Sequence, residues 1–237
     1  MQLIVGVALD ANTTTVQLQR FSRKKGGRWK PVGEVFDGRL GANGLAWGRG
    51  LNPQEPMPAG LAAKHEGDRR SPAGVFALGT AFGYARDVTR RPSQPYVQVT
   101  PYDLFVEDPT SPAYNTHVRL DHLPSSEWER GQQMEQSDPS HALEVVINHN
   151  TQPSVVPGAG SAILFHIWRR AGVATTTGCT AMSEAQLRSI VAWIDPLLEP
   201  MYVLLPQQVY ATLAPSWGLP TLTVPWLTPT RPRSAGE

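Results

Sequence analysis

The hydrophobic positions of the chain fall mostly into short runs separated by glycine, proline and polar turns. Apolar or alternating runs of roughly four to eight residues between such turns are typical of β-strands. On this pattern we expect strands within residues 3–9, 14–21, 29–35, 142–150, 161–168 and 201–206. Proline (22) and glycine (21) are spread along the whole chain, which favours short strands over long helices. The pattern therefore predicts a mainly β fold.

One segment has the pattern of a helix instead. Ser183 and Gln186 have the spacing of a capping box, and Pro196 ends the helix that we expect over 183–196. Its apolar side chains recur at helical spacing: Leu187, Ile190, Val191 and Ile194. A second, short helix is expected within 125–136.

Three further segments are expected to lack regular structure for most of their length. Residues 38–60 are rich in glycine and proline and predict an ordered loop. Residues 64–84 predict a polar turn, then a turn at the Ser-Pro-Ala-Gly sequence, then a short apolar strand. The polar, proline-rich end at 228–237 predicts a mobile tail.

The strand expected within 161–168 carries a histidine between apolar residues. Successive side chains of a strand point to opposite faces of the sheet. His166 therefore projects from the face opposite Phe165, together with Leu164 and Trp168.

The composition excludes several classes of partner. Lys plus Arg (21) nearly balance Asp plus Glu (20), so a net charge of +1 gives no basic field for nucleic acid or anionic lipid. No apolar run reaches the roughly eighteen residues of a membrane span. The first residues lack the positive region and cleavage site of a signal peptide. We therefore expect a protein that acts in the cytoplasm, or one whose leader was removed.

The single cysteine of the chain, Cys179, follows Thr176, Thr177 and Gly178 and comes after the strand that bears His166. One cysteine excludes an intramolecular disulfide and a zinc site built from several cysteines. A thiol attacks as a thiolate, so a neighbouring imidazole that takes its proton makes it a nucleophile. Gly178 lets the chain bend so that the N–H groups of residues 178 and 179 can face one oxygen.

The same residues allow a plainer interpretation. Free cysteine is among the most buried residue types, so Cys179 can be a small core residue. A histidine on a strand is likewise often a structural group. The residue types alone leave both interpretations open.

A family resemblance favours the chemical interpretation. His166, followed by Thr176-Thr177-Gly178-Cys179-Thr180-Ala181-Met182, resembles the signature of the L,D-transpeptidase catalytic domain family (YkuD-type), in which His precedes Ser/Thr-x-Gly-Cys-x-x-Met. EGDRRSPAGVFALG (66–79) is similar to the family's Glu-Gly-Asp and Ser/Thr-Pro-Ala-Gly stretch, and GANGLAWGRG (41–50) to its glycine-tryptophan loop. The resemblance covers about residues 40–206.

The resemblance implies a β-sandwich-like domain with a few short helices and no cofactor. It implies an N-terminal β-meander at 1–40 packed on a catalytic domain at 41–227, with the tail at 228–237. It also implies a periplasmic or cell-envelope location, because that is where peptidoglycan lies.

The implied reaction is cross-linking of peptidoglycan. Cys179 would attack a carbonyl of a stem peptide and pass the acyl group to an amine of a second stem, normally that of diaminopimelate. Carried over from the family, His166 is the general base, and the N–H groups of Gly178 and Cys179 form the oxyanion hole. A thiol of this kind also opens the ring of carbapenem-type inhibitors.

The chain departs from the family pattern beside both catalytic positions. Ala181 stands where the commoner signature has arginine, which predicts an unusual choice of scissile bond. Ile167 and Trp168 follow His166 in place of a small residue. Trp168 would wall the cleft or stack on substrate, or else belong to the core.

Other residues are weaker candidates. Thr176 and Thr177 place hydroxyls beside the thiol, Arg169 would attract stem carboxylates, and His149 would line the cleft unless it is structural. Glu66 and Asp68 are expected to hydrogen-bond their loop rather than to act as an acid–base pair. The remaining histidines lack ligand spacing and are expected at the surface: His65, His117, His122 and His141.

Three alternatives to the transpeptidase stay open. Water in place of the amine would give an L,D-carboxypeptidase or endopeptidase. A packed, inert thiol would leave a wall-binding β module without activity. A zinc hydrolase is the third, although no metal-ligand spacing supports it.

Overall fold

The structure is a computed structural model that describes residues 1–51, 55–134 and 137–222. In it 34% of the chain is strand and 16% is helix, which confirms the predicted mainly β class. The tail predicted to be mobile, 228–237, lies outside the described residues. None of the described helices is long and apolar enough to cross a bilayer.

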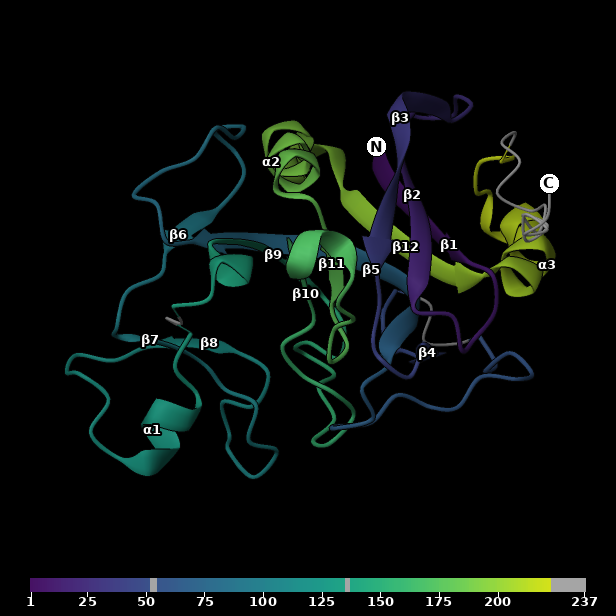
Figure 1. Cartoon of the computed structure of the whole chain (residues 1–237). Helices are drawn as coiled ribbons and strands as arrows, with labels where there is room; N and C mark the ends of the chain where they lie inside the picture. The colour runs from purple at the N-terminus through teal and green to yellow at the C-terminus, as the bar shows by residue number, and fades with distance from the viewer. Residues whose placement is uncertain (52–54, 135–136, 223–237) are drawn as a thin grey trace, which may run out of the picture.

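One ten-stranded sheet forms the body of the protein (Figure 1). Its order is β12 (Pro200–Pro206), β1 (Gln2–Ala8), β2 (Thr15–Ser22), β3 (Lys30–Arg39), β11 (Thr180–Met182), β10 (Leu164–Ile167), β9 (Leu143–Ile147), β5 (Ser71–Gly83) and β4 (Leu45–Trp47), with β6 (Tyr96–Gln98) beside β5. Because β12 pairs with β5 as well as with β1, the strands from β12 to β5 form a closed ring around the core.

The first three strands are integral to this ring. β1 pairs in parallel with β12, and the antiparallel strands β1, β2 and β3 lead to β11, which β3 meets at the pair Arg39 and Ala181. The segment that carries Cys179 is thus hydrogen-bonded to the N-terminal strands. The division of the chain at residues 40 and 227 stays a prediction.

The core fills the inside of the ring. Phe165 of β10 packs against Tyr202 of β12 with 4.7 Å between ring centroids, and neither side chain is exposed. Burial of a side chain of this size stabilises a fold by about 1.5–3 kcal/mol. Because Phe165 points inward, its neighbour His166 points to the outer face of the ring, as the alternation predicted.

The helix expected over 183–196 forms as α2 (Glu184–Trp193) and covers β9 and β10. Ser183 caps it by accepting a hydrogen bond from the Gln186 N–H at 3.3 Å. The helix ends before Pro196, because the residue that precedes a proline is disfavoured in helical conformation. A 3₁₀ turn, Pro196–Leu198, follows.

Several elements differ from the prediction. Strand β4 (Leu45–Trp47) lies within 38–60, where an ordered loop was expected. The turn expected at Ser-Pro-Ala-Gly does not form, because these residues begin β5 and pair with β4, where the fixed φ of Pro72 fits an extended strand. Helix α3 (Gln207–Trp217) was not predicted. It contains Pro215 and buries only Tyr210, so it lacks an apolar stripe that the sequence pattern could show.

Two short strands and a helix form a lobe beside the ring (Figure 1). They are β7 (Asp103–Phe105), β8 (His117–Arg119) and α1 (Glu127–Gly131). Helix α1 confirms the short helix expected within 125–136, of which residues 135 and 136 lie outside the described part. A small apolar cluster joins the lobe to the sheet: Phe82, Val99, Phe105 and Met134.

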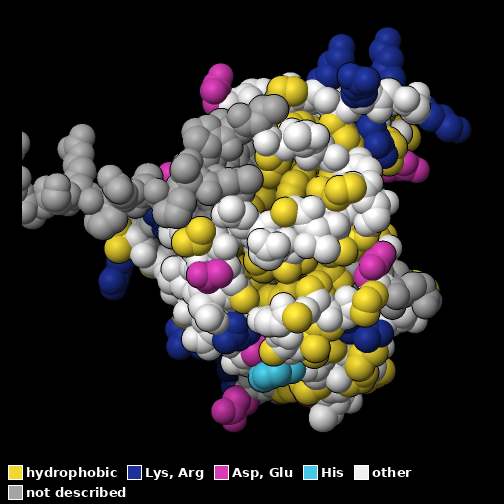
Figure 2. Space-filling model, turned by 90° about the vertical axis from the view of Figure 1, so that its right-hand side faces the viewer, with side chains coloured by type: hydrophobic (Ala, Val, Ile, Leu, Met, Phe, Trp, Pro, Cys, Tyr) yellow, Lys and Arg dark blue, Asp and Glu magenta, His cyan; other side chains and the backbone are white. Residues whose placement is uncertain are grey.

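The opposite side of the molecule, near α3, carries an apolar hollow (Figure 2). Its volume is about 430 Å³, and Trp29, Trp217 and Leu219 are among the residues that line it. It shares no lining residue with the cavity at Cys179 described below. The hollow is therefore separate from the candidate site.

Candidate active site

A tight turn leads into β11 and places Cys179 immediately before that strand. The Cys179 carbonyl accepts hydrogen bonds from the Ser71 hydroxyl at 2.9 Å and the Thr176 hydroxyl at 2.7 Å. The Gly178 N–H donates to the same Thr176 oxygen at 3.1 Å. Thr176 is buried, so its hydroxyl holds the turn and does not face the cavity. Sequence reasoning missed Ser71, whose partner is 108 positions away.

Gly178 is required by its conformation and its surroundings. Its φ is 150°, a value that side-chain-bearing residues rarely adopt. A Cβ there would lie 3.2 Å from the Arg70 carbonyl oxygen and 3.3 Å from Ile163. The Gly178 N–H is already donated to the Thr176 hydroxyl within the turn, and its use in an oxyanion hole stays a prediction.

Strand pairing brings Cys179 and His166 to the same face. β10 and β11 run in parallel, with Phe165 opposite Thr180 and His166 opposite Ala181. Phe165 and Thr180 point into the ring, since Thr180 contacts the buried Tyr202 hydroxyl. Cys179, one residue before Thr180, therefore shares the outer face with His166 on the adjacent strand.

The Cys179 thiol is nearly dry. The residue is 9% exposed, and its sulfur donates to the Ala162 carbonyl at 3.4 Å. Burial is the main cause that raises the pKa of the thiol to about 12, and the charges of Glu144 and Glu107 raise it as well. A hydrogen bond from the Leu164 N–H to the sulfur lowers the pKa but does not outweigh burial. The resting group is consequently a protonated thiol at neutral pH.

His166 is held as a neutral imidazole. Its Nδ1 lies 2.8 Å from the Ile167 carbonyl oxygen, which can only accept, so Nδ1 carries the proton and Nε2 is the basic nitrogen. Burial lowers the pKa of His166 to about 4, and this outweighs the stabilising bond to the carbonyl. The imidazole is thus unprotonated throughout the neutral range.

A cavity of about 510 Å³ opens beside the thiol. Four of the predicted site residues line it: Thr177, Gly178, Cys179 and Arg169. The other predicted residues do not: Thr176, His166, Trp168 and His149. The walls come from the segment after β4, from the lobe and from β9, which are far apart in the sequence.

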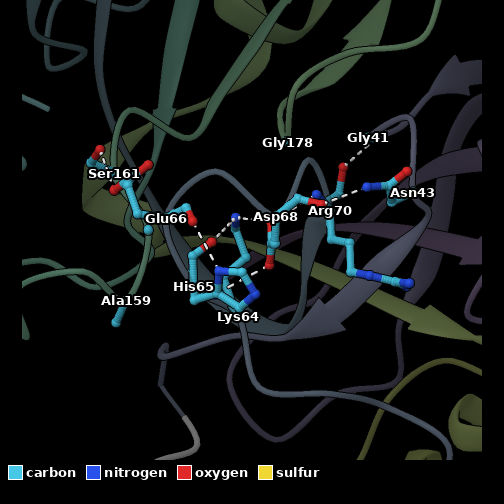
Figure 3. A network of polar contacts seen from close by, with 12 residues as sticks. Gly41, Asn43, Lys64, His65, Glu66, Asp68, Arg70, Ala159, Ser161 and Gly178 are labelled. Carbon is cyan, nitrogen blue, oxygen red and sulfur yellow. Dashed lines mark hydrogen bonds and ion pairs between the residues drawn. The ribbon is translucent and has the colours of Figure 1, made fainter.

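One wall of the cavity rests on a buried ion pair (Figure 3). Lys64 donates to Asp68 at 2.6 Å, and the two side chains are 3% and 4% exposed. Asp68 also accepts from the His65 and Arg70 N–H groups at 3.1 and 2.8 Å. Burial alone would raise the pKa of Asp68, but these bonds outweigh it and lower the pKa. Asp68 holds its loop, as the sequence predicted.

Glu66 instead bridges distant segments. It accepts hydrogen bonds from the Ser161 hydroxyl at 2.9 Å and from the Tyr114 hydroxyl. Glu66 therefore links the segment of Lys64 and Asp68 to the residues before β10 and to the lobe. Burial, with Glu66 beside it, raises the pKa of Tyr114 to about 12. Glu66 and Asp68 thus have separate partners and do not form an acid–base pair.

Two of the cavity residues that sequence reasoning did not propose for the site lie beside His166. Glu144 of β9 lies opposite His166 in the strand register and is 3% exposed. It accepts a hydrogen bond from Nδ1 of His141, whose ring stacks on His166 at 5.4 Å between centroids. The expectation that His141 is a surface residue holds only in part, because the ring borders the cavity but is held by the buried carboxylate. The sequence signal was a lone charge inside the apolar strand Leu143–Ile147.

His149 lies away from the cavity. Its Nδ1 accepts from the Arg49 N–H at 3.1 Å, and its Nε2 lies 2.9 Å from the Ala159 carbonyl oxygen. Burial lowers the pKa of His149 to about 4. Both ring nitrogens are used by the backbone, so the structure supports the structural alternative for this residue.

Trp168 and Arg169 leave β10 in different directions. The Arg39 guanidinium lies 5.8 Å from the Trp168 ring, and Trp168 lines an adjacent hollow of about 280 Å³ that Arg169 also borders. Arg169 reaches the cavity and donates to Asp138 at 2.6 Å. The indole therefore does not wall the cavity at Cys179.

The remaining histidines divide into two kinds. His65 and His122 are exposed, as expected. His117 is half-buried, 2.9 Å from the buried Asp103 carboxylate and packed on Phe82, so the expected surface position holds only in part. Among the described residues, no three His, Cys, Asp or Glu side chains are placed to hold a metal ion.

Comparison with known families agrees with this geometry. The model of the L,D-transpeptidase catalytic domain (YkuD) matches residues 42–203, well over half of the chain. The protein belongs to the L,D-transpeptidase catalytic domain family. No curated protein and no solved structure gave a significant match.

The ion pair predicts a large effect on stability. Asp68→Asn leaves the Lys64 ammonium buried without a counter-charge, so we expect a loss of about 3–5 kcal/mol in the free energy of unfolding. Urea unfolding followed by tryptophan fluorescence measures it. The double variant Lys64→Met with Asp68→Asn removes the orphaned charge and should recover much of the loss. Additive losses in the double variant would contradict the coupling.

The thiol environment predicts an unusual pH dependence of alkylation. With a pKa of about 12, the thiolate fraction grows about tenfold per pH unit across pH 6–9, so the iodoacetamide rate at Cys179 should keep rising. Mass spectrometry of the single cysteine gives the rate directly. In urea the same rate should level off near pH 8.5, the ordinary thiol value. A plateau below pH 9 in the folded protein would contradict the raised pKa.

Proposed function

We propose that the protein is a cysteine L,D-transpeptidase of peptidoglycan. The observation that carries the proposal is the parallel pairing of β10 and β11, which puts Cys179 and His166 on one outer face, with the thiol opening into a cavity. Membership of the L,D-transpeptidase catalytic domain family supports the substrate class. Because the polymer lies outside the cytoplasmic membrane, we place the activity in the cell envelope.

In the proposed reaction, the Cys179 sulfur attacks a peptide carbonyl of a stem while its proton passes to Nε2 of His166. The carbon–nitrogen bond breaks, the leaving amine takes the proton, and a thioester to Cys179 remains. The thiol and the imidazole are both neutral at rest, so proton transfer accompanies attack instead of preceding it. The Cys179 N–H is the proposed oxyanion donor, since that of Gly178 is engaged within the turn.

An amine of a second stem then attacks the thioester and forms the cross-link. Water in its place would give an L,D-carboxypeptidase or endopeptidase from the same acyl-enzyme. The cavity of about 510 Å³ has room for more than one peptide group beside the thiol. Carbapenems would acylate the same sulfur.

The dryness of the thiol favours a second candidate, a wall-binding module without activity. A thiol that is 9% exposed and has a pKa of about 12 is also what a packed cysteine shows. The two candidates differ in one outcome, which is covalent acylation of Cys179.

We expect Cys179→Ala to abolish cross-linking and His166→Ala to slow it by about 10²–10⁴-fold, the usual worth of a general base. Purified tri-, tetra- and pentapeptide muropeptides serve as substrates, and mass spectrometry identifies dimers, trimmed products and the acyl adduct. His122→Ala is the matched control, because it removes an exposed histidine. Full activity in Cys179→Ala would remove the thiol from the mechanism, and wall binding without any adduct would favour the module.

A further inference from the structure

A carboxylate–imidazole pair lines the cavity beside the thiol. His141 and Glu144 are joined by a hydrogen bond between Nδ1 and a carboxylate oxygen, and their side chains are 19% and 4% exposed. Both residues line the cavity that contains Cys179. The described reaction of Cys179 with His166 uses neither of them.

The hydrogen bonds of His141 define which of its ring nitrogens carries the proton. An Arg169 nitrogen lies 3.4 Å from Nε2 of His141, and a guanidinium can only donate. Nε2 therefore carries the lone pair, and Nδ1 carries the proton that is donated to Glu144. A carboxylate on Nδ1–H holds an imidazole in the orientation and tautomer of a general base.

The two stacked histidines differ in their access. His166 is 6% exposed, does not line the cavity, and donates Nδ1–H to a backbone carbonyl. His141 lies over it with 19° between the ring planes and borders the open space. A second substrate that enters the cavity would meet the ring of His141 and not that of His166.

We propose that His141 is a second general base, positioned by Glu144, which accepts the proton of the incoming amine when the acyl group is transferred. The inference rests on the proposed function and assigns its second half. The amine nitrogen bonds to the thioester carbon, the carbon–sulfur bond breaks, and the sulfur leaves as a thiolate that takes up a proton from solvent, because the proton first taken by His166 has left with the first amine. The proton lost by the amine goes to Nε2 of His141, in place of the 3.4 Å contact from Arg169, and later to solvent.

Glu144 has a positioning role in this step. Its carboxylate fixes the ring of His141 and balances the charge that the ring gains on taking a proton. Burial raises the pKa of Glu144, and the hydrogen bond from His141 opposes this shift. Glu144→Gln keeps an oxygen that can accept from Nδ1 but removes the charge, so it separates orientation from charge balance.

The test separates acylation from transfer. We would mix the protein with a tetrapeptide muropeptide, quench at intervals, and measure both the adduct on Cys179 and the cross-linked dimer by mass spectrometry. In His141→Ala we expect acylation within about threefold of the unaltered protein, while transfer falls about a hundredfold and the adduct accumulates. Glu144→Gln should show the same split, less strongly. Added imidazole should restore part of the transfer in His141→Ala only.

Each result bears on the inference. Unchanged transfer in His141→Ala, or equal losses of acylation and transfer without rescue by imidazole, would overturn the role of His141 and leave Cys179 as nucleophile. His122→Ala serves as the control for loss of a histidine elsewhere. Failure of the unaltered protein to form any adduct on Cys179 would overturn the proposed function, and this inference with it.

Discussion

The candidate site depends on how the backbone of one short turn is held. The Cys179 carbonyl accepts two hydroxyl groups, from Ser71 and Thr176, and the next residue starts a strand that is paired with β10. Neutral hydrogen bonds of this kind are each worth only about 1 kcal/mol net. Their larger effect is geometric, because they set where β11 begins. A shift of one residue in that start would turn the sulfur from the cavity into the core.

The closed sheet has an inner face that packs the apolar core and an outer face that carries the candidate site. Along β10 the core takes Phe165 and the outer face takes His166, so one strand serves both purposes through simple alternation. The outer face is then covered by the lobe and by the loop that Lys64 and Asp68 brace. This cover keeps the thiol out of water, and the ring of His141 lies over the imidazole of His166. Burial makes both groups neutral.

The sequence predicted what depends on local pattern. Periodicity predicted the strands of the first 40 residues, α2 and the outward direction of His166. The motif spacing indicated the family signature. The sequence did not predict the partners of those residues. His141 and Glu144 have ordinary local surroundings, and only the pairing of β9 with β10 places them at the thiol. Ser71 was not proposed as a site residue, because the Ser-Pro-Ala-Gly sequence predicted a turn where β5 begins. His149 and Trp168 were candidates by proximity in sequence, yet their rings face elsewhere.

The dryness of the thiol also bears on selectivity between amine and water. A thiolate formed in advance would react with many electrophiles, whereas a neutral thiol reacts only when a bound carbonyl and a base are both in position. The same logic applies to the second half of the reaction. An amine reaches the cavity largely as an ammonium ion and must lose a proton to attack, whereas water is already neutral. In the proposed reaction, the base at the cavity wall takes the proton that a bound ammonium must lose before it attacks. The stacked rings of His141 and His166 differ in access, because His141 borders the cavity at Cys179 and His166 does not.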